Sequence, residues 1–142
     1  MKKFLKVVCV LLVGITLFTT TAFATEEMAP RASNYFMVTS TFIERYSDSS
    51  LEIWFDVTAV DQMSVLGVRY IELQQSTDRS NWTTVKTYDK ANYSQMTCAN
   101  TVAHADCVTY QGSSSYYYRA YVEFYAKNSS GTGVYSRYTA TV

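Results

Sequence analysis

The side chains of this chain best suited to recognition are aromatic, and they gather in one stretch. Residues 116–127 read Tyr-Tyr-Tyr-Arg-Ala-Tyr-Val-Glu-Phe-Tyr-Ala-Lys. Alternate side chains of a β-strand point to opposite faces, so this stretch predicts a strand with one apolar face. The other face would place Arg119 in a row with Tyr117, Tyr121 and Tyr125, with successive side chains of that face about 7 Å apart along the strand. Such a row suits binding of a protein or of flat sugar rings. The alternative is a plain sheet face stabilised by cross-strand aromatic pairs.

Trp54 is a second candidate binding residue. It falls between Glu52 and Asp56, among the alternate residues that would form the polar face of a strand over residues 51–59. An exposed tryptophan between two acids indicates either a binding residue or one that the preceding N-terminal segment covers. The two carboxylates would lie about 13 Å apart by strand rise, farther than the pairs that glycosidases use. The apolar face of the same strand would be formed by Leu51, Ile53, Phe55, Val57 and Ala59.

Motifs for catalysis or metal binding are missing from the sequence. His104 is the single histidine, two residues before Asp106. We find no Gly-x-Ser-x-Gly, no His-Glu-x-x-His and no glycine-rich phosphate loop, and the aspartates do not form a calcium-binding run. The sequence therefore predicts no catalytic residue, no cofactor and no metal, and it places His104 in a polar loop.

The first 24 residues have the pattern of a signal peptide. Three lysines among the first six residues precede an apolar run over residues 4–18, and Ala22-Phe23-Ala24 gives a small-x-small cleavage site. The alternative, a retained membrane anchor, requires a longer uninterrupted apolar run. We expect a secreted, extracellular protein that begins at Thr25 and does not insert into membranes.

Removal of residues 1–24 changes both the charge and the cysteine count. Three lysines leave, so the mature net charge becomes −3, and Cys98 and Cys107 remain as the only cysteines. A negative chain has no long-range attraction to nucleic acid or anionic lipid. In an exported protein an even cysteine pair predicts a disulfide, here Cys98–Cys107, with a metal site or reactive thiol as the alternative.

The rest of the chain reads as short strands separated by turns. Residues 25–34 predict a flexible lead-in, and residues 35–142 predict an all-β domain, an antiparallel seven-stranded β-sandwich. A slip of parity near Tyr70 predicts a β-bulge there. Between Cys98 and Cys107 we expect an insertion over residues 99–106, closed at its base by the disulfide. The seven extended runs are residues 35–43, 51–59, 66–75, 82–88, 93–111 with that insertion, 116–127 and 134–142.

Two segments resemble a known family. Residues 71–85, Ile-Glu-Leu-Gln-Gln-Ser-Thr-Asp-Arg-Ser-Asn-Trp-Thr-Thr-Val, resemble the middle hairpin of fibronectin type III domains. Residues 118–136 look like the penultimate strand, turn and last strand of the same immunoglobulin-like fold. The family's core tryptophan is replaced by Phe55, with Trp54 out of phase. The chain also resembles small secreted proteins of Gram-positive bacteria.

Rich surface aromatics without catalytic groups favour a monomeric, non-catalytic binding or adhesion module for an extracellular glycan or protein. Two other classes stay open. One is a small exported toxin or bacteriocin-like effector, and the other is a hydrolase with an unrecognised site around His104.

Overall fold

The computed structural model describes residues 34–142; the predicted signal peptide and residues 25–33 of the predicted lead-in lie outside the described residues. Within them the chain is all-β, and no helix there is long and apolar enough to cross a membrane. One short 3₁₀ turn, η1 (Ser94–Met96), interrupts the strands. The strands are β1 (Phe36–Ser47), β2 (Ser50–Ser76), β3 (Thr83–Asp89), β4 (Thr97–Gln111), β5 (Tyr117–Asn128) and β6 (Gly131–Tyr138).

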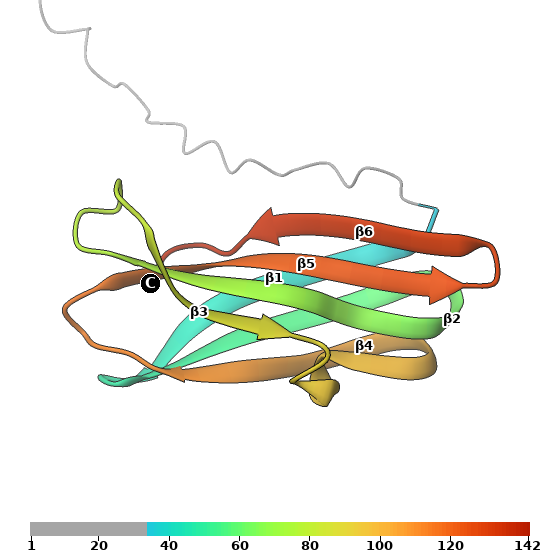
Figure 1. Cartoon of the computed structure of the whole chain (residues 1–142), viewed down its shortest axis with the longest axis horizontal. Helices are drawn as coiled ribbons and strands as arrows, with labels where there is room; N and C mark the ends of the chain where they lie inside the picture. The colour runs from blue at the N-terminus through green and yellow to red at the C-terminus, as the bar shows by residue number, and fades with distance from the viewer. Residues whose placement is uncertain (1–33) are drawn as a thin grey trace, which may run out of the picture.

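All six strands join one antiparallel sheet, and β2 is the strand that connects it (Figure 1). Its first half, residues 50–60, pairs with β1 on one side and with β4 on the other. Its second half, residues 65–76, pairs with β5 and β3, and β6 pairs with β5. The predicted strands 51–59 and 66–75 are therefore one continuous strand, which gives six strands where seven were predicted.

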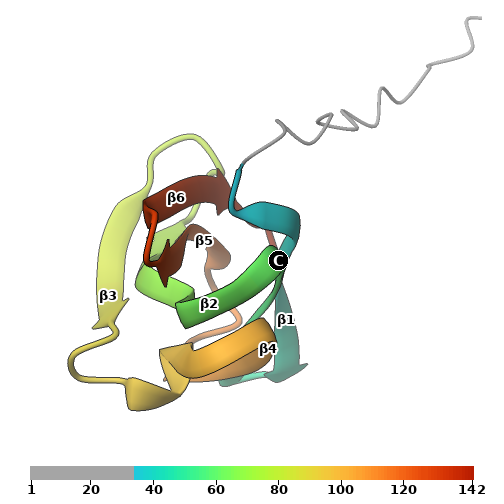
Figure 2. The ribbon, with the colours of Figure 1, turned by 90° about the vertical axis from the view of Figure 1, so that its right-hand side faces the viewer.

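The sheet curls so that its two halves face each other across a common interior (Figure 2). The halves meet at Gly67, where β2 pairs at once with Thr97 of β4 and with Tyr125 of β5. Gly67 has a φ of +150°, and a Cβ there would lie 2.2 Å from the Met96 carbonyl oxygen. Only glycine allows the three backbones to approach this closely.

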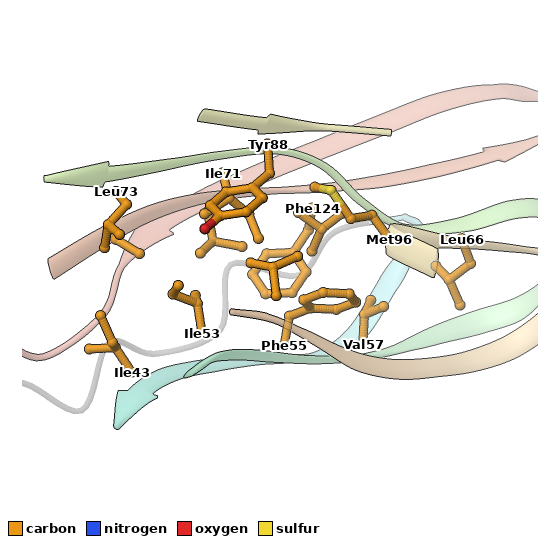
Figure 3. Packing of buried hydrophobic residues seen from close by; sticks show 14 of the residues in the cluster. Ile43, Ile53, Phe55, Val57, Leu66, Ile71, Leu73, Tyr88, Met96 and Phe124 are labelled. Atoms are coloured by element: carbon orange, nitrogen blue, oxygen red, sulfur yellow. The ribbon is translucent and has the colours of Figure 1, made fainter. Parts of the chain in front are cut away.

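The core is formed by the two alternating patterns read from the sequence (Figure 3). Phe55 of β2 and Phe124 of β5 both lie fully inside it, and the predicted bulge is confirmed as a register shift between Val68 and Tyr70. The prediction that both segments cover one apolar interior is confirmed. The buried positions of these segments are Leu51, Ile53, Phe55, Val57 and Ala59 from β2, and Tyr118, Ala120, Val122, Phe124 and Ala126 from β5.

The predicted insertion over residues 99–106, and the disulfide at its base, are wrong. These residues belong to β4, whose Cys98 pairs with Leu66 and whose Cys107 pairs with Trp54. Both cysteines are free, Cys98 exposed and Cys107 half-buried. They sit near opposite ends of one strand, about 30 Å apart by strand rise, whereas a disulfide needs Cα atoms about 6 Å apart.

Candidate functional site: two outward faces of the sheet

The predicted aromatic row lies on the outward face of β5. Tyr117 is exposed, whereas Arg119, Tyr121 and Tyr125 are half-buried among neighbours from adjacent strands. In register, Arg119 stands opposite Gln74 of β2. Tyr121 stands between Glu72 of β2 and Tyr138 of β6, and its ring centroid lies 5.3 Å from that of Tyr138. The four residues predicted on β5 are thus brought to one surface.

Arg119 is held between two aromatic rings. Its guanidinium carbon lies 4.2 Å from the ring centroid of Trp82, from the turn before β3, and 4.6 Å from that of Tyr138. Its Nε donates a hydrogen bond of 2.8 Å to Oε1 of Gln74. Cation–π contacts on both sides and a hydrogen bond at the edge fix this planar group in one position.

Two tyrosines of the β5 row each have a cationic side chain above the ring. Arg79 lies 4.0 Å above the Tyr117 ring, and Lys90 lies 4.0 Å above the Tyr125 ring. Arg69 approaches Tyr125 from farther away and forms an ion pair with Glu123. We call this surface the aromatic–cationic face, and it consists of Arg69, Arg79, Trp82, Lys90, Tyr117, Arg119, Tyr121, Tyr125 and Tyr138.

The carboxylates of this face are occupied by their own neighbours. Glu72 accepts hydrogen bonds from Thr84 (2.7 Å) and Gln74 (2.6 Å), and these bonds lower the pKa of Glu72. Glu123 accepts from Arg69. In the adjoining turn Asp78 accepts from the backbone and side chain of Asn81 first among several donors, which lowers the pKa of Asp78. Among the described residues, the exposed cations Arg79 and Lys90 form no ion pair, so they can attract an anionic partner.

Trp82, Tyr138 and the cations from the turns were not predicted as site residues. The sequence placed Trp82 at the start of a strand and gave no role to Arg79. Both lie beside β5 only because the turn of residues 77–82 folds back over it, with Arg79 at a φ of +61°. The hairpin resemblance was the one signal that could have located Trp82.

Trp54 lies on the other half of the sheet, apart from the β5 row. It stands between Phe42 of β1 and Cys107 of β4. The rings of Trp54 and Phe42 stack with centroids 6.1 Å apart and planes 13° apart. Trp54 Nε1 donates to Oε2 of Glu52 at 3.0 Å. The sequence predicted Trp54 as a second candidate binding residue on another outward face, and in the structure it lies apart from Arg119.

The surface around Trp54 combines apolar side chains with acids. Glu44 stands directly opposite Glu52 in the register. Arg45 turns away from this surface, because its guanidinium donates to the carbonyls of Ser113 and Tyr116. We call this surface the apolar–acidic face. It consists of the outward residues Val38, Phe42, Glu44 and Tyr46 of β1, Glu52, Trp54 and Asp56 of β2, and Cys107 of β4.

A third feature is an open hollow of about 510 Å³ between β3 and β4. Tyr88 crosses it and donates a 2.8 Å hydrogen bond to the Thr109 carbonyl, and burial raises the pKa of Tyr88. Tyr93 and Tyr110 complete its aromatic lining, with Lys86 nearby.

His104 lies on β4 and not in the predicted loop. Its Nε2 is 2.8 Å from the Gln95 carbonyl oxygen, and its ring centroid is 5.7 Å from that of Phe55. Across residues 34–142, no three His, Cys, Asp or Glu side chains gather as a metal site would require. His104 therefore packs at the edge of the core.

The fold and the two faces define a class: an all-β chain with one curled antiparallel sheet and two chemically different outward surfaces. No protein-family model, curated protein or solved structure matches this chain.

Proposed function

We propose that this chain is a secreted, non-catalytic β-sandwich of the fibronectin III or immunoglobulin type that binds a protein ligand through its aromatic–cationic face. The pairing of β1, the first half of β2 and β4 over β3, the second half of β2, β5 and β6 supports the sandwich. Secretion rests on the signal-like pattern of residues 1–24. The observation that carries the binding function is Arg119 held between Trp82 and Tyr138.

The aromatic rings of this face are partly covered, which favours a protein ligand over a glycan. A sugar ring stacks on an uncovered aromatic face, whereas Tyr117 and Tyr125 each have one face covered by a cation of the same chain. Trp, Tyr and Arg are also the residues that contribute most to protein–protein binding. Because these side chains are already ordered, binding costs little further side-chain entropy. The exposed cations favour a ligand that presents carboxylates.

The test measures binding of the labelled exported protein to intact cells and to a glycan array. We expect saturable cell binding that protease treatment of the cells removes, and at least about tenfold weaker binding by Arg119→Glu, as for a central interface residue. Ser129→Ala, in the exposed β5–β6 turn, is the matched control and should bind as wild type. Circular dichroism checks that both variants are folded.

Two results would overturn the proposal. Protease-resistant binding together with array signals would assign the face to glycans. Unchanged binding by Arg119→Glu would place the ligand elsewhere on the molecule.

A further inference from the structure

Within residues 34–142, much of the apolar–acidic face stays exposed. Phe42 is 48 % exposed, Val38 52 % and Tyr46 77 %. These three are among the nine large hydrophobic residues that remain exposed in the described part of the chain, and they lie together on one surface of β1. A concentration of apolar side chains on one sheet surface marks an interaction site.

The acids on this face point to the charge of its partner. Glu44 and Glu52 stand directly opposite each other, an arrangement that destabilises a sheet. Trp54 is the one hydrogen-bond donor to these side chains among the described residues, and Asp56 is exposed. A partner that brings cations would relieve the repulsion and would bury the rings between them.

The aromatic–cationic face has the complementary chemistry. Its carboxylates already accept hydrogen bonds from their own neighbours, whereas Arg119 presents a guanidinium held by rings. Lys90 is exposed, and so is Lys127, the next outward residue of β5 after Tyr125, which extends the face. Each face thus supplies what the other lacks, anionic groups with uncovered rings on one side and cations with ordered rings on the other.

The charge of the predicted lead-in makes it less suited than a second copy of the chain to cover the apolar–acidic face. Residues 25–33 contain Glu26 and Glu27 against the single cation Arg31. With the free amino group of Thr25 that segment has no net charge, so it brings no net positive charge to offset Glu44 and Glu52. A second copy brings a positive face instead.

We infer that the protein ligand of the aromatic–cationic face is a second copy of this chain, docked through its apolar–acidic face. This inference rests on the proposed function. The two faces belong to opposite halves of the curled sheet, so each copy offers one face to each neighbour (Figure 2). Such a head-to-tail contact does not close on itself by a two-fold axis and extends into rings or open chains. It replaces the monomer expected from the sequence with concentration-dependent assembly.

The first experiment measures the average mass of the purified exported protein by sedimentation over a range of concentrations. We expect the mass to rise with concentration at about 50 mM salt and to fall back toward the monomer at about 500 mM, where charges are strongly screened. A monomer at every concentration and salt would overturn the inference.

The decisive experiment mixes two variants, each with one face disabled. Glu44→Lys with Asp56→Lys reverses the charge of the apolar–acidic face. Lys90→Ala with Lys127→Ala removes cations from the aromatic–cationic face without touching the Arg119 stack, and it creates no acids with which the reversed face could pair. Each variant alone should remain monomeric. Their equimolar mixture should form a one-to-one dimer and stop there, because it contains one intact face of each kind.

Other outcomes contradict the inference in different ways. A symmetric dimer would leave one variant self-associating and would gain nothing from mixing. If the exported protein stays monomeric but still binds cells through Arg119, the second-copy partner is wrong and the proposed function stands. If assembly occurs and Arg119→Glu has no effect on cell binding, the proposed cell-surface ligand is wrong and the self-association stands.

Discussion

The two outward faces of this sheet carry aromatic side chains in opposite states. On the aromatic–cationic face, Tyr117, Tyr125 and Trp82 each lie about 4 Å from a cation of the same chain. On the apolar–acidic face, Phe42 and Trp54 stack on each other with carboxylates at their edges and no cation. The first set of rings is satisfied within the monomer, and the second set is not.

This difference separates two uses of surface aromatics. Rings covered by the chain's own cations contribute to folding and hold a binding group such as Arg119 in place. Exposed rings that stack only on each other, beside acids without a cation partner, contribute less to the stability of the isolated chain and gain by contact with a partner. A row of tyrosines in a sequence does not by itself tell which use applies, because the cations come from turns elsewhere in the chain.

The largest expected effect tests whether the two faces depend on one structure. Gly67→Ala places a Cβ against the Met96 carbonyl at a positive φ, so we expect a loss of about 3 kcal/mol or more in the free energy of unfolding. Urea denaturation followed separately by far-UV dichroism and tryptophan fluorescence measures it. The two signals should shift together, and the exposed strand variant Thr132→Ala should lie close to wild type. Separate transitions would mean that the halves unfold independently.

The next effect compares the faces directly. Arg119→Ala removes two cation–π contacts and should lower the free energy of unfolding by about 1–2 kcal/mol. Phe42→Ala removes one exposed stacked ring and should cost less than about 1 kcal/mol. Arg119→Lys serves as control and should recover only part of the loss, because an ammonium lacks the planar guanidinium. Equal losses from Arg119→Ala and Phe42→Ala would remove the distinction between satisfied and unsatisfied rings.

A smaller effect should have opposite signs on the two faces. Glu44→Gln removes a like-charge pair with Glu52, and we expect the free energy of unfolding to rise by about 0.2–1 kcal/mol. Glu123→Gln breaks the ion pair with Arg69, and we expect a fall of about the same size. Urea midpoints at low salt measure both, and high salt should shrink both. A loss of stability in Glu44→Gln would show that this carboxylate has a favourable role in the monomer.

Much of the fold could be predicted because the two-residue period is local. The alternation around Phe55 and around Val122 needs no knowledge of the partner strands, and neither did the slip at Tyr70. The joining of residues 51–59 to 66–75 could not be predicted in this way. Asp61 and Gln62 lie at a register shift of β2, and the strand stays continuous because Ala59 pairs with Phe36 before them and Met63 pairs with Thr101 after them.

The segment 99–106 was misread for a related reason. β4 pairs with β2 on one side only, so most of its side chains are exposed and Val108 is its one fully buried residue. A strand at an edge carries little hydrophobic pattern, and the two cysteines suggested a loop in its place. The candidate site could be predicted only in part, for the same reason. The β5 row follows from a pattern within one stretch of sequence, whereas Trp82 and Tyr138 reach Arg119 from other segments of the chain.

The smallest predicted effect concerns the reactivity of the two cysteines, of which Cys107 lies on the apolar–acidic face. Without reductant both thiols should react with a maleimide, Cys98 faster than Cys107, because Cys107 is less exposed and burial, with Glu52 and Asp106 nearby, raises its pKa. Peptide mass spectrometry over time gives both rates.

At concentrations that favour assembly, labelling of Cys107 beside Trp54 should slow while the labelling of Cys98, near the other end of β4, is unchanged. The variant Glu44→Lys with Asp56→Lys should lose that concentration dependence. Absence of labelling until reductant is added would restore the disulfide, and equal slowing of both thiols would move the contact away from the apolar–acidic face.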